Sequence, residues 1–339
     1  MDRHAEQIVR AGEEAGKTYT FNEDHDPTQP AQWWFQDSEE GLVLFVVFYT
    51  QACRWSSCLG CNLPSKSSRF HVGYKSLIAQ VDHLLALPDM QGRFGEIRKF
   101  IVSNNGSVLD EETFSSTALM YLVARAKMTM PRLRIVSMET RPEYVDLPEL
   151  EFLARALREE QAGIDLELAI GFEAYDDRIR NEVFKKGLEL ERFEAFIADV
   201  APFGFSVKCY FMQKPVPEMT DEAAVNDIRQ AIDYLDRLAG RFDVRLNMHL
   251  NPTYVASGTP LERFFNEGTY TPPRLLDVAK AAHHAKGRRL SVFIGLYDEG
   301  LAVPGGSFLR EGDGPLLAEL EIFNRTQDFK QLETGHACS

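Results

Sequence analysis

Short apolar runs alternate with longer amphipathic segments along most of the chain. Runs rich in Val, Ile and Phe predict seven strands, at 42–49, 97–103, 133–138, 166–172, 205–212, 244–250 and 288–296. Segments of helical period predict helices at 74–86, 110–126, 147–160, 190–200, 221–240, 272–285 and 314–325, with Asp110 and Thr220 as N-caps. This alternation is typical of repeated βα units around a parallel sheet.

The first six strands and their helices predict an α/β fold, a partial (β/α)6 barrel of the TIM type. We expect residues 1–40 to form an N-terminal cap, 41–285 the barrel, and 286–339 a C-terminal extension with a mobile tail. Trp33 and Trp34 in the cap are expected to serve packing rather than ligand binding.

Composition and charge limit the classes of function that the chain can have. The 339 residues are 44% hydrophobic, enough for one large catalytic domain, and the formal net charge is −14. Affinity for phosphate backbones comes from clustered Lys and Arg, so direct nucleic-acid binding is not expected. The N-terminus is charged, without the apolar core of a signal peptide, and no run of about 18 apolar residues occurs. We expect a cytoplasmic protein that does not bind a membrane.

Three of the five cysteines lie in the segment YTQACRWSSCLGC, directly after the first predicted strand. Cys53, Cys58 and Cys61 have four and then two residues between them, so their thiolates can converge on an iron–sulfur cluster or a zinc ion. Three ligands leave one position open. We favour a four-iron cluster with one iron free of protein ligands.

Other uses of these cysteines fit less well. A plant-type ferredoxin has similar spacing but needs a fourth cysteine, and none follows before Cys209. A structural zinc site would require a fourth ligand such as His71, and no second CxxC motif occurs. A disulfide framework does not suit a large acidic chain with few cysteines.

Polar segments follow five further strands: SNNGSVLD, METRPE, GFEAYDD, MQKP and HLNPTY. Reactive groups of βα barrels come from the loops at the carboxyl ends of the strands. The pattern therefore favours an enzyme. An iron–sulfur electron carrier or a zinc-stabilised binding protein would leave these polar strand ends unexplained.

Several motifs within residues 42–285 resemble the radical S-adenosylmethionine (SAM) superfamily: ETRPE (139–143), GFEAYDDRIRNEVFKKG (171–187), VKCYFMQKP (207–215) and SGTPLERFFNEGTYTPP (257–273). They are similar to the branch with the Elongator catalytic subunit, coproporphyrinogen dehydrogenase and, most closely, the radical-SAM subunit of archaeosine synthase. The usual cysteine spacing in that family is three then two, so the first gap here is one residue longer. A weaker resemblance is to the radical SAM enzyme of arsinothricin biosynthesis.

The resemblance implies the cofactors. Cys53, Cys58 and Cys61 would hold a [4Fe-4S] cluster, and the amino and carboxylate groups of SAM would occupy the fourth iron. A reductant such as flavodoxin or ferredoxin would supply one electron for reductive cleavage of SAM. Most of the family then generates a 5′-deoxyadenosyl radical, whereas a minority of SAM-cleaving iron–sulfur enzymes release a 3-amino-3-carboxypropyl group.

The resemblance also implies residues that bind SAM, at the ends of the strands: Asn104, Asn105, Gly106 and Ser107; Glu139 and Glu173; Lys186, or else Lys185; Arg141; and His249 with Asn251. For Arg141, pinning the turn before a proline is an equal alternative. Cys209 and Cys338 are candidate catalytic thiols, although Cys209 also suits a buried core position and Cys338 a mobile tail. His283 and His284 are expected to be structural.

Two substrates follow from the resemblance. The first is a small molecule, with 3-amino-3-carboxypropyl transfer to arsenite as one concrete reaction. The alternative is modification of a tRNA nucleobase together with a partner subunit, as in archaeosine synthesis. The acidity of the chain favours the small molecule.

Overall fold

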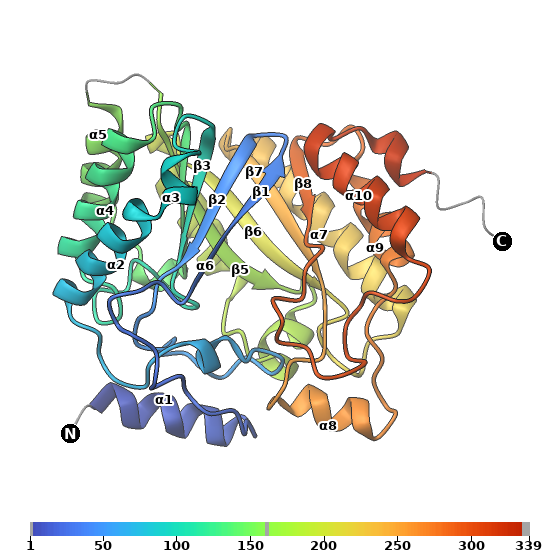
Figure 1. Ribbon diagram of the computed structural model, residues 1–339. Coiled ribbons are helices and arrows are strands. Elements are labelled where there is room, and N and C mark those ends of the chain that lie inside the picture. The colour runs from blue at the N-terminus through green and yellow to red at the C-terminus, as the bar shows by residue number, and fades with distance from the viewer. Residues whose placement is uncertain (1–2, 160–162, 334–339) are drawn as a thin grey trace.

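The computed structural model describes residues 3–159 and 163–333. Its centre is one sheet of eight strands in the order β1 to β8 (Figure 1). Strands β2 to β8 are parallel, and β1 pairs antiparallel with β2. The strands are β1 (Gln32–Ser38), β2 (Gly41–Val47), β3 (Ile97–Ser103), β4 (Ile135–Thr140), β5 (Asp165–Glu173), β6 (Ser206–Gln213), β7 (Leu246–Pro252) and β8 (Leu290–Ile294).

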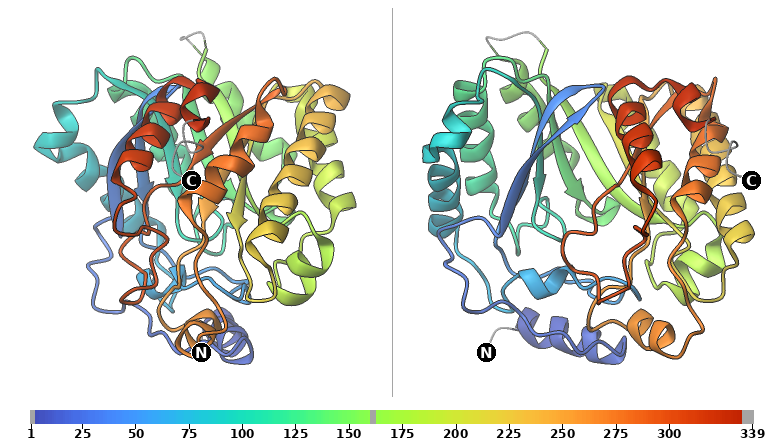
Figure 2. Two further views of the ribbon diagram at one scale, coloured as in Figure 1. Left: turned by 90° about the vertical axis from the view of Figure 1, so that its right-hand side faces the viewer. Right: turned by 45° about the vertical axis from the view of Figure 1, so that its right-hand side comes forward.

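The sheet curls into a partial barrel, with most helices packed against its outer face (Figures 1 and 2). The helices are α1 (Arg3–Glu14), α2 (Tyr74–Ala86), α3 (Pro88–Gln91), α4 (Ser116–Thr129), α5 (Leu147–Arg158), α6 (Leu190–Val200), α7 (Asp221–Phe242), α8 (Pro260–Asn266), α9 (Leu275–Ala282) and α10 (Gly314–Thr326). The predicted partial barrel is confirmed, and the seven predicted strands correspond to β2 to β8.

Some local predictions need correction. The helix predicted from residue 110 begins only at Ser116, because Asp110 pairs with Arg54 and turns the loop before it. Asp110 is therefore not an N-cap. Thr220 is one, since its hydroxyl accepts a hydrogen bond from the Ala223 amide over 3.1 Å.

Four of these helices and strands were not predicted: α1, β1, α3 and α8. Strand β1 extends the sheet before residue 41, and β8 extends it after residue 285. The proposed division into cap, barrel and extension stays a prediction. In β1, Trp34 stacks on Phe45 of β2 with ring centroids 4.2 Å apart, in line with a packing role.

Alternate residues of each strand face the helices or the barrel interior. On β6, Val207, Cys209 and Phe211 belong to the apolar core. The opposite face carries Lys208 and Tyr210, whose polar atoms bond to the neighbouring inward residues of β7 and β4. Polar side chains thus line the interior of the barrel.

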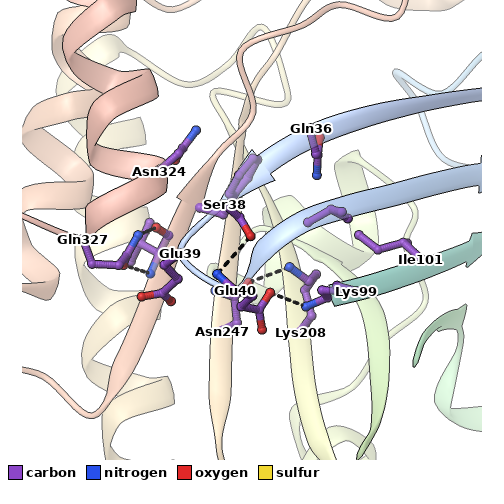
Figure 3. Close-up of a pocket in the computed structure, with 13 residues that line it drawn as sticks. Gln36, Ser38, Glu39, Glu40, Lys99, Ile101, Lys208, Asn247, Asn324 and Gln327 are labelled. Carbon is purple, nitrogen blue, oxygen red and sulfur yellow. Dashed lines mark hydrogen bonds and ion pairs between the residues drawn. The ribbon is translucent and has the colours of Figure 1, made fainter. Parts of the chain in front are cut away.

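The amino-terminal end of the interior is filled by a charged cluster, shown in Figure 3. The Lys99 ammonium lies 2.6 Å from a Glu40 carboxylate oxygen and 2.8 Å from a Glu167 oxygen. The Lys208 ammonium donates to the Asn247 side chain over 3.0 Å. Two carboxylates balance the Lys99 charge, and we assign the cluster to barrel closure.

The other end of the barrel, where the parallel strands terminate, is covered by α1 and α8 (Figure 1). The chain after α1 contacts the segment just before α8: the Thr18 amide donates a hydrogen bond to the Gly258 carbonyl over 2.9 Å. Among the described residues, no helix is both long and apolar enough to cross a membrane.

Candidate active site

The three-cysteine loop follows β2 and lies at the carboxyl ends of the strands. One side of this loop packs on the loop after β3. A Cβ atom at Gly106 would stand 3.2 Å from the Cys53 Cα, so glycine permits this close backbone contact. The Arg54 guanidinium donates to the Asp110 carboxylate over 2.6 Å. The first cysteine is therefore fixed against β3.

The other side of the cysteine loop packs on the loop after β5. The Trp55 indole donates to the Lys185 carbonyl over 2.8 Å, and the Leu59 amide donates to the Phe184 carbonyl over the same distance. The Trp55 ring also covers Gly187, where a Cβ would come within 2.4 Å of it. Strand-end loops on both sides thus position the thiols.

The three thiols lie close enough to interact electrostatically. Cys53, Cys58 and Cys61 each raise the pKa of the Tyr19 phenol, although burial contributes more. Burial also raises the pKa of Cys58 to about 12 and that of Cys61 above its ordinary value. As free thiols both are protonated at neutral pH, so a metal centre would have to displace their protons.

The donor set fits an iron–sulfur cluster with one open position. The three thiols share one loop, and in residues 3–159 and 163–333 no three His, Cys, Asp or Glu side chains, these thiols included, are placed to hold a single metal ion. The fourth zinc ligand considered above, His71, is exposed and has Nδ1 3.0 Å from the Glu112 carbonyl. Soft thiolates without a fourth protein ligand suit a cluster better than structural zinc.

Next to the cysteine loop stands an ion pair from the end of β5. The Lys186 ammonium lies 2.8 Å from a Glu173 oxygen, and both side chains are largely buried. Both charges act on the Cys58 thiol. Burial lowers the pKa of Lys186, but the Glu173 carboxylate leads the opposing effects and the net shift is upward, so Lys186 stays charged. The loop after β5 thus presents two opposite, largely buried charges beside the cysteine loop.

A second group of predicted residues lines the interior below this pair. The Tyr210 hydroxyl donates to Glu139 over 2.8 Å, and the Tyr210 ring lies 4.9 Å from the His249 ring. Burial raises the pKa of Glu139 and holds that of His249 well below its ordinary value. His249 is therefore neutral, and its buried Nδ1 has no hydrogen-bond partner in the described chain.

Other predicted SAM ligands serve the loops themselves. The Asn104 side chain accepts from the Gly106 amide over 3.1 Å and donates to the Ser107 carbonyl over 3.3 Å. The Ser107 hydroxyl lies 2.6 Å from that of Thr140. These side chains thus shape the loop after β3.

Arg141 pins a turn, which was the alternative considered for it. Its guanidinium donates to the Lys186 carbonyl over 3.1 Å and to the Gly187 carbonyl over 3.3 Å, and it also bonds to Glu143. It lies over the Trp55 ring at 4.5 Å from the centroid. Arg141 therefore positions the loop that carries Lys186.

The two candidate catalytic thiols are not part of this constellation. Cys209 is fully buried in the apolar core, on the helix-facing side of β6, and so points away from the interior. Its catalytic assignment is not supported by this placement. Cys338 lies outside the described residues. Asn251 is at the end of β7, where its side chain fills the space beside Gly295.

Glu299, in the loop after β8, was not anticipated. Burial, the Glu139 carboxylate and Asp298 raise its pKa to about 7. Glu299 in turn raises the pKa of Tyr210 and Tyr254, so it faces the same interior. Its sequence context, YDEG, resembles an ordinary turn and gives no sign of a buried acid.

Backbone conformation marks the same edge of the sheet. Residues other than glycine that adopt positive φ in strand-end loops are Ser56, Asn105, Glu173, Lys185, Lys214 and Glu299. This conformation is unfavourable for side-chain-bearing residues and concentrates at functional sites. The carboxyl edge is thus the candidate active site.

Sequence comparison finds relatives over most of the chain. An uncharacterised protein of Methanocaldococcus jannaschii is 23% identical over 326 residues, covering 92% of this chain and 86% of its own. Archaeosine synthase subunit beta of Methanosarcina acetivorans is 28% identical over 269 residues, 75% and 72% of the two chains. The subunit beta of Thermococcus kodakarensis is 23% identical over 319 residues, 89% and 91%. No family model matches the chain.

Several solved structures match the fold in part, with TM-scores below 0.5. Methanocaldococcus infernus Elp3 has a TM-score of 0.46 at 15% identity and covers 68% of this chain. Streptococcus suis SuiB bound to SAM scores 0.48 at 10% identity and covers 80%. Kitasatospora setae TsrM, with cobalamin and a [4Fe-4S] cluster, scores 0.42 at 14% identity and covers 88%. The matches span 54%, 54% and 61% of those longer chains.

The sequence relatives agree with the predicted resemblance, since two of them are archaeosine synthase β subunits. The expected partners were wrong in one respect. A small-molecule substrate without nucleic-acid binding disagrees with relatives that are subunits of an enzyme making archaeosine, a modified nucleoside of tRNA.

Proposed function

We propose that this chain is the radical SAM subunit of a two-subunit enzyme that modifies a nucleobase in tRNA. The observation that carries the proposal is the match to two archaeosine synthase β subunits over most of each chain. The predicted alternative thus replaces the small molecule as the substrate.

The residues at the carboxyl edge have distinct roles in this proposal. Cys53, Cys58 and Cys61 would hold the [4Fe-4S] cluster, and the ion pair of Glu173 and Lys186 would orient SAM through its charged groups. When bound, the two cofactors would supply a carbon-centred radical that removes a hydrogen atom from the substrate. The covering segments around α1 and α8 would exclude water from the site.

The acidity of the chain indicates which contacts the partner subunit would make to tRNA. With a formal net charge of −14, this chain offers little attraction for a phosphate backbone. The partner subunit would supply the cationic contacts to tRNA, and the barrel would receive only the base to be modified. A nucleobase can be presented in this way once it leaves its stack.

The first experiment identifies the fragments of SAM. Anaerobically reconstituted protein is mixed with dithionite, SAM and tRNA that has been treated with the complementary subunit of the Methanosarcina acetivorans enzyme. We expect 5′-deoxyadenosine and methionine by mass spectrometry, together with a change of mass in one nucleoside of the digested tRNA. The control replaces Cys53, Cys58 and Cys61 by alanine, and it should abolish both signals.

Four outcomes separate the possibilities. Cleavage of SAM with an altered nucleoside supports the whole proposal. Cleavage that gives methylthioadenosine would show that a different carbon–sulfur bond breaks. Cleavage with no altered nucleoside in any tRNA would contradict the substrate, and the absence of an iron–sulfur cluster would contradict the class.

A further inference from the structure

Lys17 enters the candidate site from a part of the chain that no motif marks. It follows α1 and donates its ammonium to the Ser56 carbonyl over 2.7 Å, in the middle of the three-cysteine loop. The lysine is only 8% exposed. The long, charged side chain of Lys17 therefore packs on the three-cysteine loop and is shielded from solvent.

This buried ammonium has no carboxylate partner. No Asp or Glu oxygen of the described chain lies within ion-pair distance of it, and it contacts the Ser56 carbonyl and lies 5.5 Å from the centroid of the Tyr19 ring. Two other lysines with largely buried side chains, Lys99 and Lys186, do have carboxylate partners. A buried charge without a counter-ion is costly, which points to an anionic group that completes the site.

The three-cysteine loop is the element that Lys17 contacts, since Ser56 lies between Cys53 and Cys58 in the sequence. Thiolates bound in a cluster would carry the missing negative charge.

The segment that carries Lys17 is fixed on both sides of the loop. The Thr18 amide donates to Gly258 over 2.9 Å, and the Asn22 amide donates to the Ser67 carbonyl over 3.1 Å. The Asn22 carbonyl also accepts from the Tyr49 hydroxyl over 2.5 Å. The position of the ammonium is therefore set by backbone contacts and does not depend on a flexible tail.

We propose that Lys17 is the counter-ion of the cluster and a positioning residue that makes one-electron reduction of that cluster easier. The potential of an iron–sulfur cluster depends on net charge, hydrogen bonding and solvent exposure. A fixed positive charge favours the more negative reduced form. One electron from a low-potential donor is gained, and no bond is made or broken. The inference rests on the proposed cluster but not on the tRNA substrate.

The test is an anaerobic redox titration of the reconstituted full-length protein, followed by electron paramagnetic resonance in the absence of SAM. We expect Lys17→Met to move the midpoint to a more negative potential and Lys17→Arg to retain the wild-type value. Arg10→Met is the matched control, since it removes one positive charge from an 80% exposed side chain on α1. It should leave the midpoint unchanged.

If Lys17→Met does not bind the cluster, its iron content is measured instead of its potential. Loss of iron from Lys17→Met, with retention in Lys17→Arg and Arg10→Met, would also support a required charge. The proposal is overturned if Lys17→Met titrates like wild type, if Arg10→Met shifts equally, or if both Lys17 variants lose iron alike. A wild-type protein without a cluster would instead refute the proposed function itself.

Discussion

The Lys186 ammonium and the Glu173 carboxylate meet over 2.8 Å in space that only a glycine at position 171 leaves open. A Cβ at Gly171 would stand 2.3 Å from Lys186 Nζ and 2.7 Å from the nearer Glu173 oxygen. Gly171 is the first residue of the GFEAYDD segment, so its small size is part of the candidate SAM site.

Gly171→Ala should weaken SAM binding. The added methyl group displaces the ends of two flexible side chains, so the fold should survive while the ion pair moves. We expect affinity for SAM to fall by about tenfold, or about 1.4 kcal/mol, as measured by calorimetric titration of the cluster-loaded protein. Gly73→Ala is the control, because no atom lies within 4 Å of its Cβ and φ is −69°. Equal affinity for SAM in both variants would show that the ion pair of Glu173 and Lys186 does not belong to the SAM site.

Gly106→Ala should impair the metal centre itself. Its Cβ would approach the Cys53 backbone, at 3.2 Å from Cα, and a backbone atom yields less readily than the end of a side chain. We expect iron and sulfide per chain to fall after reconstitution, with little change in circular dichroism. Full cluster loading would show that the loop after β3 does not position Cys53.

Glu299 predicts a dependence of stability on pH. Its folded pKa of about 7 lies above the ordinary 4.5, so between these values the unfolded chain loses a proton that the folded protein keeps. Stability contributed by Glu299 therefore falls as pH rises from about 4.5 to about 7 and then levels off. The interior of the barrel resists a second carboxylate near Glu139.

Glu299→Gln should remove that penalty. In the iron-free protein we expect little difference from wild type at about pH 4 and a gain of about 1–3 kcal/mol in unfolding free energy at about pH 8. Urea unfolding at the two pH values measures this difference. Glu321→Gln, on an exposed position of α10, should show no such trend. A gain that is the same at both pH values would contradict the raised pKa.

The repeating part of the fold could be predicted because its pattern is strong. Strands β2 to β8 are apolar runs, and α2, α5 and α6 begin at the predicted residues. Helix α1 was missed because five of the twelve residues of RHAEQIVRAGEE are charged and the helix buries only Ala5, Ile8 and Gly12. The segment is nonetheless amphipathic, so its periodicity could have indicated a helix.

The candidate site likewise contains some residues that could be predicted from the sequence and others that could not. The cysteines, Glu173 and Lys186 stand in motifs and could be named from the sequence. Lys17 and Glu299 could not, since a single lysine or glutamate carries no sign that distant segments will bury it. The alternation along β6 predicts that Cys209 faces either the apolar core or the barrel interior. The structure decides between them, because Lys208 lies on the interior face and Cys209 in the apolar core.

Cys209→Ser decides whether that thiol takes part in chemistry. Its side chain lies in the apolar core, and burial raises the pKa of the thiol far above its ordinary range, so it is neither accessible nor ionised. A hydroxyl in this position should cost about 1–3 kcal/mol of stability, read from urea unfolding, while SAM cleavage per cluster stays at the wild-type rate. Cys209→Ala controls for the lost sulfur without adding a polar group and should cost less. If folded, cluster-loaded Cys209→Ser and Cys209→Ala both lost cleavage, Cys209 would be catalytic after all, and the outward orientation of its side chain on β6 would be wrong.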